Sequence, residues 1–332
     1  MEVGVAVTGF VAEAPGRVCL FGEHQDYLGW PVVAGAIDLT CQIQFHRTPS
    51  NRLELDLPDI AAHAHWPGPP VGRPFDYLSA AWRAEPVTGW RATVRGTLPR
   101  AAGASSSTAL VTAFVAGLAH AAGRAVAAAD LACAAHHAEV TSQGEPGGQM
   151  DHLAIAHGGL HAFYFDGRPP ERLPIPDAAC LLIDTHEPKA TLAILERAKA
   201  RRIALVANPG AATSPADRAL LAATEASRDH SAEGTAALRA GDLPSAGAAL
   251  TAHHAFLRDT LGVSTPRLEA ALEAALTHGA YGGKLNGSGG GGTAVVLAPH
   301  DRASQVMEAV RATGSTPYLV QLGAPGARIH PE

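Results

Sequence analysis

The sequence APGRVCLFGEHQDYLG, residues 14–29, is the stretch that decides the fold. Its first half is an apolar run typical of a strand, and the strand leads into a turn that carries Glu23, His24 and Asp26 within four positions. Polar side chains at the end of a strand are positioned by the rigid part of a fold. Carboxylates accept hydrogen bonds from hydroxyl groups. We therefore predict that these three residues bind a polyhydroxylated substrate, with a solvated polar turn as the alternative.

A second segment, LPRAAGASSSTAL at residues 98–110, places small residues before the start of a helix. The first turn of a helix offers free backbone N–H groups and the positive end of the helix dipole, which suit a nucleotide phosphate. The candidates are Gly103, Ser105, Ser106 and Ser107. A serine that only caps the helix is the alternative. The pattern G-x-x-x-x-G-K-S/T does not occur in the sequence, so a Walker loop is excluded.

A third segment, GGKLNGSGGGGT at residues 282–293, is rich in glycine. It contains a match to G-x-G-x-x-G, but the apolar run after it predicts that a strand follows. A dinucleotide-binding fingerprint follows a strand and opens a helix, so that interpretation is rejected. Glycine lets a backbone approach a ligand or a neighbouring loop closely. We expect such an approach here, and a flexible loop is the alternative.

The periodicity of the apolar residues around these segments predicts an α+β fold. Strands are predicted at 3–7, 41–45, 53–57, 90–94, 160–165, 179–184, 293–298 and 318–322. Helices are predicted at 105–123, at 127–142 and over most of 190–278. Strands and helices are partly segregated along the chain, which is typical of the α+β class.

A chain of 332 residues favours two lobes with a cleft between them. The proline-rich stretch at 168–176 is the predicted boundary. We therefore expect an N-terminal domain at 1–175, which holds the substrate turn and the phosphate loop, and a C-terminal α+β domain at 176–332, which holds the glycine-rich segment. A β-turn within one sheet would give the same pattern at 168–176.

Composition excludes several classes of partner. The net charge is -6, and the 25 Lys and Arg residues are dispersed, so we expect no nucleic-acid partner. The uncharged segment at 101–123 consists mainly of small residues, so we predict a buried helix and no membrane span. The four cysteines form no C-x-x-C pair, and the N-terminus lacks a signal-peptide pattern, which together favour a cytoplasmic protein. The spacing of the 17 histidines matches no zinc site.

Together with a fourth segment, AEVTSQGEPGGQMDH at residues 138–152, these motifs resemble those of the GHMP kinases. The family is named for galactokinase, homoserine kinase, mevalonate kinase and phosphomevalonate kinase. Arg17 and Asp26 make the first motif most similar to the galactokinase-like branch. The resemblance spans residues 14–292 and implies the two-lobed GHMP kinase fold, with the active site in the cleft between the lobes.

The resemblance also implies roles for individual residues. Asp151 ends the pattern G-x-P-x-G-x-M-D and corresponds to the catalytic base, while Arg17 would neutralise phosphate charge and keep Asp151 ionised. Glu139 corresponds to a magnesium ligand, with the hydroxyl of Ser106 as a second ligand. Ser105 and Ser107 would face the phosphates or cap the helix. The implied cofactors are ATP and Mg²⁺.

The implied reaction is ATP-dependent phosphorylation of a sugar hydroxyl, at the anomeric position of galactose or of a related sugar or uronic acid. Ala101 replaces a family glycine, Cys19 replaces an asparagine, and residues 184–191 replace the galactokinase pattern N-x-x-V-K-H, which leaves the nucleotide and the sugar open. Two alternatives remain: a mevalonate-type or other non-sugar kinase, and an inactive sugar-sensing regulator. A small-molecule sugar is the expected partner, and the chain is expected to be a monomer or a homodimer.

Overall fold

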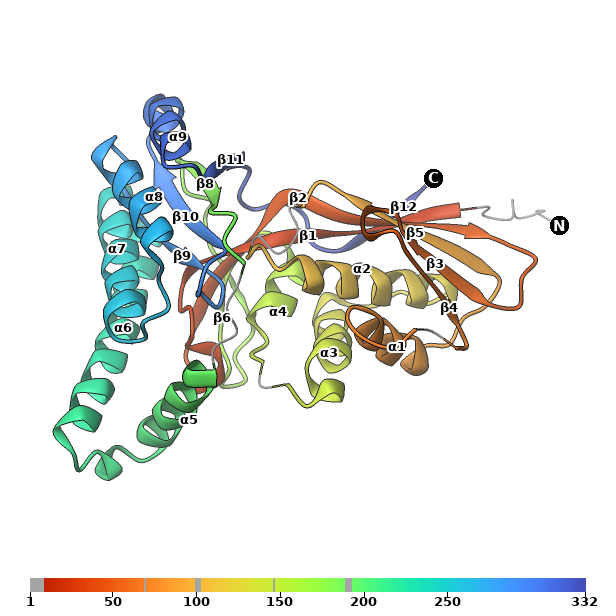
Figure 1. Cartoon of the computed structure of the whole chain (residues 1–332), viewed down its shortest axis with the longest axis horizontal. Coiled ribbons are helices and arrows are strands. Elements are labelled where there is room, and N and C mark those ends of the chain that lie inside the picture. The colour runs from red at the N-terminus through yellow and green to blue at the C-terminus, as the bar shows by residue number, and fades with distance from the viewer. Residues whose placement is uncertain (1–8, 69, 99–102, 146, 189–192) are drawn as a thin grey trace.

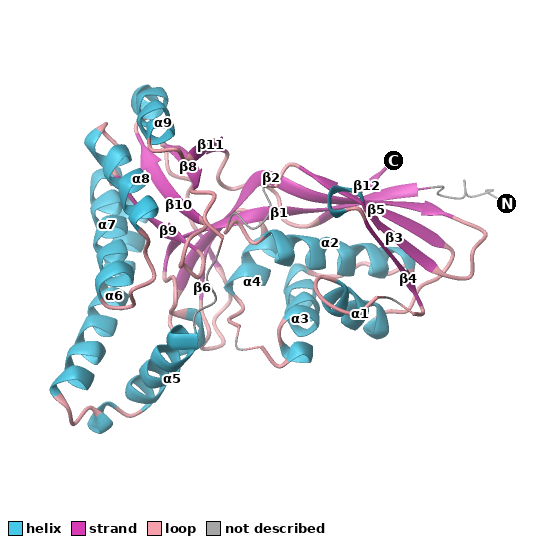
Figure 2. Cartoon of the chain, viewed as in Figure 1, coloured by secondary structure: helices cyan, strands magenta, loops and turns pink. Residues whose placement is uncertain are grey.

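A computed structural model describes residues 9–68, 70–98, 103–145, 147–188 and 193–332. The predicted strand at 3–7 and part of the predicted phosphate loop, including Ala101, lie outside the described residues. Strands and helices occupy separate layers (Figures 1 and 2), so the predicted α+β class is confirmed.

The first sheet is built on two long strands, β1 (Gly9–Phe21) and β2 (Val32–Arg47), which pair antiparallel. In the described residues its order is β12-β1-β2-β5-β3-β4, with β6 paired to β2 and β7 to β6. The remaining strands are β3 (Leu53–Leu57), β4 (Ala62–Trp66), β5 (Trp90–Gly96), β6 (Leu160–Phe163), β7 (Glu171–Arg172) and β12 (Arg328–Pro331). The predicted strands at 41–45, 53–57 and 90–94 all lie within this sheet.

Four helices lie along one side of the first sheet (Figure 1). They are α1 (Phe75–Ala84), α2 (Ser106–Ala121), α3 (Ala128–Glu139) and α4 (Met150–His157). Phe10 stacks on Phe45 with a ring distance of 4.8 Å, and Trp90 meets Phe10 edge-on at 5.1 Å. Such aromatic pairs add to the free energy of apolar burial. This core fixes α2, and with it the start of α2 at Ser106.

The second sheet has the antiparallel order β11-β8-β10-β9. Its strands are β8 (Ala179–Asp184), β9 (Gly282–Asn286), β10 (Thr293–Ala298) and β11 (Thr316–Val320). The helices of this half are α5 (Ala193–Ala207), α6 (Pro215–Ala240), α7 (Leu243–Asp259), α8 (Pro266–Thr277) and α9 (Ala303–Ala312). Leu181, Ile183 and Val296 pack with residues of α8 and α9 in one buried cluster.

The two sheets meet through a shared apolar core. Val18 and Leu20 of β1 pack in one cluster with Leu182 of β8 and Val295 of β10. The chain then returns to the first sheet, because β12 pairs with β1. Strands β1–β7 therefore precede residue 175, β8–β11 follow it and β12 returns to the first sheet, whereas the division into two domains at this position stays a prediction.

The glycine-rich third segment differs from the flexible loop that was the alternative interpretation. Its first five residues form β9, a fully buried strand, and only the glycine run between β9 and β10 is a turn. The strand predicted after the glycine run is confirmed as β10. The difference places Lys284 and Asn286 inside the protein, beside β1.

Candidate functional site

Arg17 of β1 and Asp151 of α4 form a bidentate ion pair. Arg17 Nε donates to Asp151 Oδ1 at 2.7 Å, and Arg17 Nη2 donates to Oδ2 at 2.9 Å. Arg17 is buried, whereas the side chain of Asp151 is 27% exposed. The planar guanidinium thus fixes the carboxylate in one orientation while leaving part of it open to a ligand.

The pKa of Asp151 is low. Burial alone would raise it, but the charge and hydrogen bonds of Arg17, together with a hydrogen bond from the Ser105 hydroxyl, lower it to about 2. Ser105 precedes α2 with a positive φ of 58°, and its side chain does not cap that helix. The hydroxyl therefore supports the carboxylate, and the structure brings Arg17, Ser105 and Asp151 together.

Asp26 lies in the short turn Asp26–Leu28 after β1 and reaches the start of α4. Its Oδ1 accepts from Tyr27 N at 2.9 Å, and its Oδ2 accepts from Met150 N at 3.4 Å. Burial, followed by the nearby charge of Asp151, raises the pKa of Asp26. A Cβ at Gly148 would lie 1.5 Å from Asp26 Oδ2, so only glycine allows this approach.

Glu23 is buried and paired with a buried lysine. Lys284 Nζ donates to Glu23 Oε2 at 2.8 Å, to Cys19 O at 2.9 Å and to Leu285 O at 2.7 Å. All three donors of the ammonium group are used, which offsets the cost of burying the charge. Glu23 therefore joins the substrate turn to β9, in addition to any contact with substrate.

His24 connects three segments. Its Nε2 donates to Ser288 O at 3.0 Å in the glycine run, and its Nδ1 accepts from Tyr27 Oη at 3.4 Å. Arg202 of α5 donates to the same Tyr27 oxygen at 2.8 Å. Burial lowers the pKa of His24 to about 4, although Glu23 opposes the shift, so the ring is neutral at physiological pH. The neutral ring has one donor and one acceptor, as this network requires.

The predicted phosphate loop is tied to the same network. Gly103 O accepts from Arg17 Nη1 at 2.8 Å and from Asn286 Nδ2 at 3.1 Å. Asn286 Oδ1 in turn accepts from Cys19 N at 2.8 Å. The predicted close approach of the third segment is thus an approach to β1 and to the phosphate loop.

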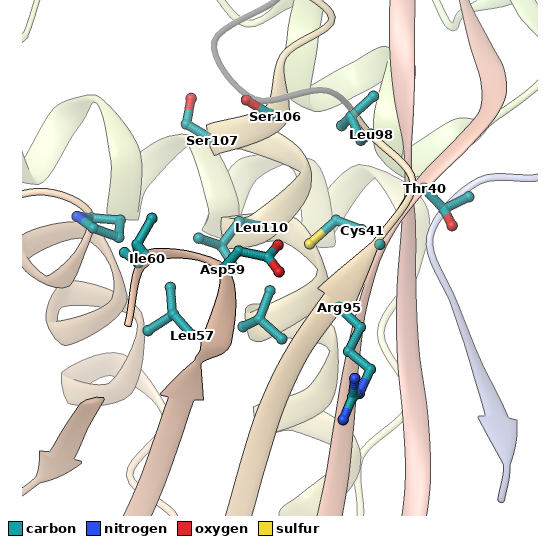
Figure 3. Close-up of a pocket in the computed structure, with 13 residues that line it drawn as sticks. Thr40, Cys41, Leu57, Asp59, Ile60, Arg95, Leu98, Ser106, Ser107 and Leu110 are labelled. Carbon is teal, nitrogen blue, oxygen red and sulfur yellow. The ribbon is translucent and has the colours of Figure 1, made fainter. Parts of the chain in front are cut away.

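A cavity of about 270 Å³ opens beside the start of α2 (Figure 3). Ser106 and Ser107 lie at one end, and the other lining residues are Thr40, Cys41, Leu57, Asp59, Ile60, Pro74, Val94, Arg95, Gly96, Leu98 and Leu110. The walls are mainly apolar, which is typical of a pocket for a flat ring with few polar contacts. If the base of a nucleotide occupied this cavity, the phosphates of that nucleotide would lie near the N-terminus of α2.

Glu139, a predicted magnesium ligand, lies at the end of α3 and accepts from His152 Nε2 at 2.9 Å through Oε2. Both side chains are buried. Within the described residues, no three His, Cys, Asp or Glu side chains form a group that could hold a metal ion. Mg²⁺ bound to a nucleotide needs only one or two protein carboxylates, because phosphates and water complete its shell. Glu139 and the Ser106 hydroxyl stay the predicted ligands of such a site.

Sequence reasoning missed Lys284, Asn286 and Arg202 as parts of the site. Lys284 and Asn286 stand in the glycine-rich segment, and a lysine and an amide between glycines could have been recognised as polar groups that need buried partners. No sequence feature marks Arg202 as buried, because it lies within a long segment whose residues are predicted to form helices.

Three family models match the chain. They are the GHMP kinases N terminal domain at residues 72–159, the GHMP kinases C terminal model at 235–316, and the galactokinase galactose-binding signature at 2–47. The galactokinase of Mycobacterium bovis is 31% identical, over 91% of this chain and 93% of its own length. The mevalonate kinase of Pyrococcus abyssi is 26% identical, over 96% and 97%.

Solved structures share the fold. The galactokinase of Lactococcus lactis complexed with galactose superposes with a TM-score of 0.85, covering 98% of this chain and 96% of its own, at 21% identity. The mevalonate kinase of Methanococcus jannaschii gives a TM-score of 0.76 at 18% identity, covering 94% and 98%. In the described part of the chain, no helix is long and apolar enough to span a membrane.

Proposed function

Because the chain belongs to the GHMP kinase family, in its galactokinase-like branch, we propose that it transfers the γ-phosphoryl group of ATP to a hydroxyl of galactose or a related sugar. The observation that carries this proposal is the ion pair of Arg17 and Asp151 beside Asp26. A partly exposed, oriented carboxylate next to a second carboxylate suits a hydroxyl substrate.

The two ligands would occupy different parts of the site. The base of ATP fits the apolar cavity beside α2, and its phosphates would reach the N-terminus of that helix at Ser105–Ser107. Glu23, His24 and Asp26 would bind the sugar, because carboxylates accept from hydroxyl groups and repel phosphates. Lys284 and Asn286 support both halves of the site through β1.

Phosphoryl transfer depends on position and on charge neutralisation. A sugar hydroxyl held by Asp151 would attack the γ-phosphorus in line with the leaving oxygen of ADP. With a pKa of about 2, Asp151 is a weak base before the reaction, so it orients the hydroxyl and takes the proton as the new oxygen–phosphorus bond forms. Arg17 holds the carboxylate ionised and adds positive charge near the phosphates.

Mg²⁺ would neutralise the charge of the ATP phosphates. Glu139 is a suitable ligand through a carboxylate oxygen, and Ser106 through its hydroxyl. The contact of Glu139 with His152 uses Oε2 and orients the carboxylate for such a role.

A substrate panel tests the proposal. ADP release is measured with galactose, its epimers, galacturonic acid and mevalonate, with Asp151→Asn as the blank. Sugar-dependent release of ADP by the wild-type protein, but not by Asp151→Asn, supports a sugar kinase. NMR of the product then shows whether the anomeric oxygen carries the phosphate. Release with mevalonate alone would overturn the assignment to sugars. Sugar binding without release from the wild-type protein would instead indicate a regulator.

A further inference from the structure

The side chain of Asn286 joins β9 to β1 and to the phosphate loop. The residue is fully buried, and its Oδ1 accepts from Cys19 N at 2.8 Å. Its Nδ2 donates to Gly103 O at 3.1 Å and to Thr293 Oγ1 at 3.4 Å. A backbone N–H can only donate and a backbone carbonyl can only accept. These partners therefore fix the orientation of the amide, and the oxygen of the amide faces β1.

The phosphate loop and Asn286 lie side by side along one edge of β1. In the described residues, β12 pairs with this edge only near the start of β1. Further along, Arg17 N donates to Ala104 O at 3.2 Å, and Cys19 N donates to Asn286. Residues two apart in a strand direct their backbone groups to the same edge. The bond from Asn286 to Gly103 O then links the two neighbours to each other.

Gly103 allows the loop to contact β9 and β10. Its φ is 76°, and a Cβ there would lie 2.4 Å from Thr293 Oγ1 and 2.9 Å from Asn286 O. Its carbonyl accepts from Asn286 and also from Arg17 Nη1. The Nε and Nη2 groups of Arg17 are bound to Asp151. Asn286 is therefore a donor to this carbonyl that does not also hold the proposed catalytic carboxylate.

The position of Gly103 determines the position of the first turn of α2. The helix begins at Ser106, and the preceding Ser105 does not cap it with its side chain. The first N–H groups of a helix have no partner within the helix, so those of Ser106 and Ser107 suit a phosphate. If Gly103 moved, these N–H groups would move relative to Asp151, and the bound phosphates would lose their alignment.

We propose that Asn286 is a positioning residue for the phosphates of ATP. Because it is fully buried, it acts through Gly103, which it holds together with the first turn of α2 at a fixed place on β1. The inference rests on the proposed kinase function and adds a residue to the nucleotide half of the site. The sugar turn is held by a separate contact, the ion pair of Glu23 with Lys284. Loss of the Asn286 amide should therefore affect ATP and not the sugar.

Two substitutions remove the donor to Gly103 O. Asn286→Asp keeps an oxygen for Cys19 N but presents a second oxygen to Gly103 O, whereas Asn286→Leu removes both contacts with a side chain of similar size. Both should raise KM for ATP roughly 10-fold, on the scale of one hydrogen bond, and leave KM for the sugar within about 2-fold. Asn286→Leu brings no charge near Arg17, so its kcat should also stay within about 2-fold of the wild type.

Calorimetry separates the phosphates from the base and needs no acceptor sugar. ATP should bind both variants ~10-fold more weakly than the wild type, whereas adenosine, which lacks phosphates, should bind all three proteins equally. If the wild type binds ATP and the variants bind it as tightly, the inference is wrong and the kinase function is untouched. If the wild type binds no ATP, both are wrong. Equal losses for ATP and adenosine would contradict a role at the phosphates.

Ser79→Ala is the matched control for a general loss of stability. Ser79 is buried, and its hydroxyl accepts from Trp66 Nε1 at 3.1 Å in the core of the first sheet. The substitution removes one buried hydrogen bond away from the phosphate loop, so it should lower the melting temperature and leave KM for ATP within about 2-fold. If KM for ATP instead rises in step with the loss of melting temperature across all three variants, Asn286 has only a structural role.

Discussion

Lys284 and Glu23 form a 2.8 Å ion pair in the interior, and the lysine has no exposed surface. The pair joins β9 to the turn after β1, two segments 261 residues apart in the sequence. A glycine-rich segment thus contributes a cation that holds the predicted sugar turn in place. The turn and the phosphate loop are built as one unit, because Asn286 of the same strand bonds to Cys19 and Gly103.

Lys284→Met should destabilise the fold. It leaves Glu23 as a buried, unpaired carboxylate, and breaking such a pair costs about 3–5 kcal/mol in the free energy of unfolding. Chemical denaturation measures the loss. In the double variant Lys284→Met/Glu23→Gln the buried charge is gone, so part of the stability should return. If the double variant is as unstable as the sum of both single variants, the two charges do not interact as described.

Asp151→Asn should reduce kcat by roughly 10²-fold or more, because the amide cannot accept the proton of the attacking hydroxyl. ATP affinity, measured by calorimetry, should be unchanged. A folded variant with a near-normal kcat would remove Asp151 from the mechanism.

The pH dependence of stability follows from the same residue. The pKa of Asp151 is about 2 in the folded protein, below the value of about 3.9 for a free aspartate. Its ion pair therefore contributes stability above the unfolded pKa, and this contribution is lost as the pH falls toward 2. In Arg17→Met the carboxyl loses its cation while burial still raises its pKa, so this acid-dependent loss of stability should shrink or disappear. Identical acid-unfolding midpoints for Asp151→Asn and wild type would contradict this.

Much of the fold could be predicted from the sequence because its strands are buried and apolar. The predicted strands at 179–184 and 293–298 coincide with β8 and β10, and the predicted helix at 105–123 contains α2. Uninterrupted apolar runs bounded by turn residues give clear signals of this kind. The strand β12 could not be predicted, because Arg328–Pro331 is too short and too polar to show the apolar pattern of a strand. Its position depends on pairing with β1.

The site was predictable where its residues cluster in sequence and not where they meet only in space. Arg17, Asp26 and Asp151 each stand in a recognisable motif. The helical segment around Arg202 has the same polar pattern as many solvent-exposed helices, yet this side chain is buried and reaches Tyr27, 175 residues away. Local periodicity carries no information about such a contact.

Arg202→Met should raise KM for the sugar. Arg202 holds Tyr27, and Tyr27 donates to His24, so the substitution loosens the substrate turn without touching Asp151. We expect KM to rise roughly 10-fold, on the scale of one hydrogen bond to a charged group, with kcat little changed. Arg201→Met on the same helix removes the pair between the exposed Arg201 and the buried Asp217, far from Tyr27 in the hydrogen-bond network, and should leave KM unchanged. Equal effects of the two variants would indicate a general loss of α5 packing.

Glu139→Gln should raise the Mg²⁺ concentration needed for half-maximal activity at least ~10-fold, because an amide is a poorer ligand than a carboxylate. The titration is carried out at saturating sugar and fixed ATP. Glu145→Gln, which removes the partly exposed partner of Arg73, is the matched control and should not change the titration. If both variants titrate like the wild type, Glu139 is a structural partner of His152 and does not bind Mg²⁺.

Asp26→Ala should weaken sugar recognition and leave ATP affinity nearly unchanged. Its carboxylate lies at the start of α4, where it can accept from a sugar hydroxyl, and a hydrogen bond to a charged group contributes about 1.5–3 kcal/mol to kcat/KM. Burial and the charge of Asp151 raise the pKa of Asp26, so its carboxylate form is lost as the pH falls through this raised pKa. KM for the sugar should therefore rise at acidic pH in the wild type but not in Asp26→Ala.

Deoxy sugars identify the hydroxyl that Asp26 contacts. A deoxy sugar that lacks this hydroxyl should lose a comparable amount of kcat/KM with the wild-type enzyme, and little more with Asp26→Ala, because both changes remove one interaction. At every other position of the ring the two losses should add. If they add at all positions, Asp26 makes no hydrogen bond to the sugar, and the assignment of the turn at Glu23–Asp26 to sugar binding is wrong.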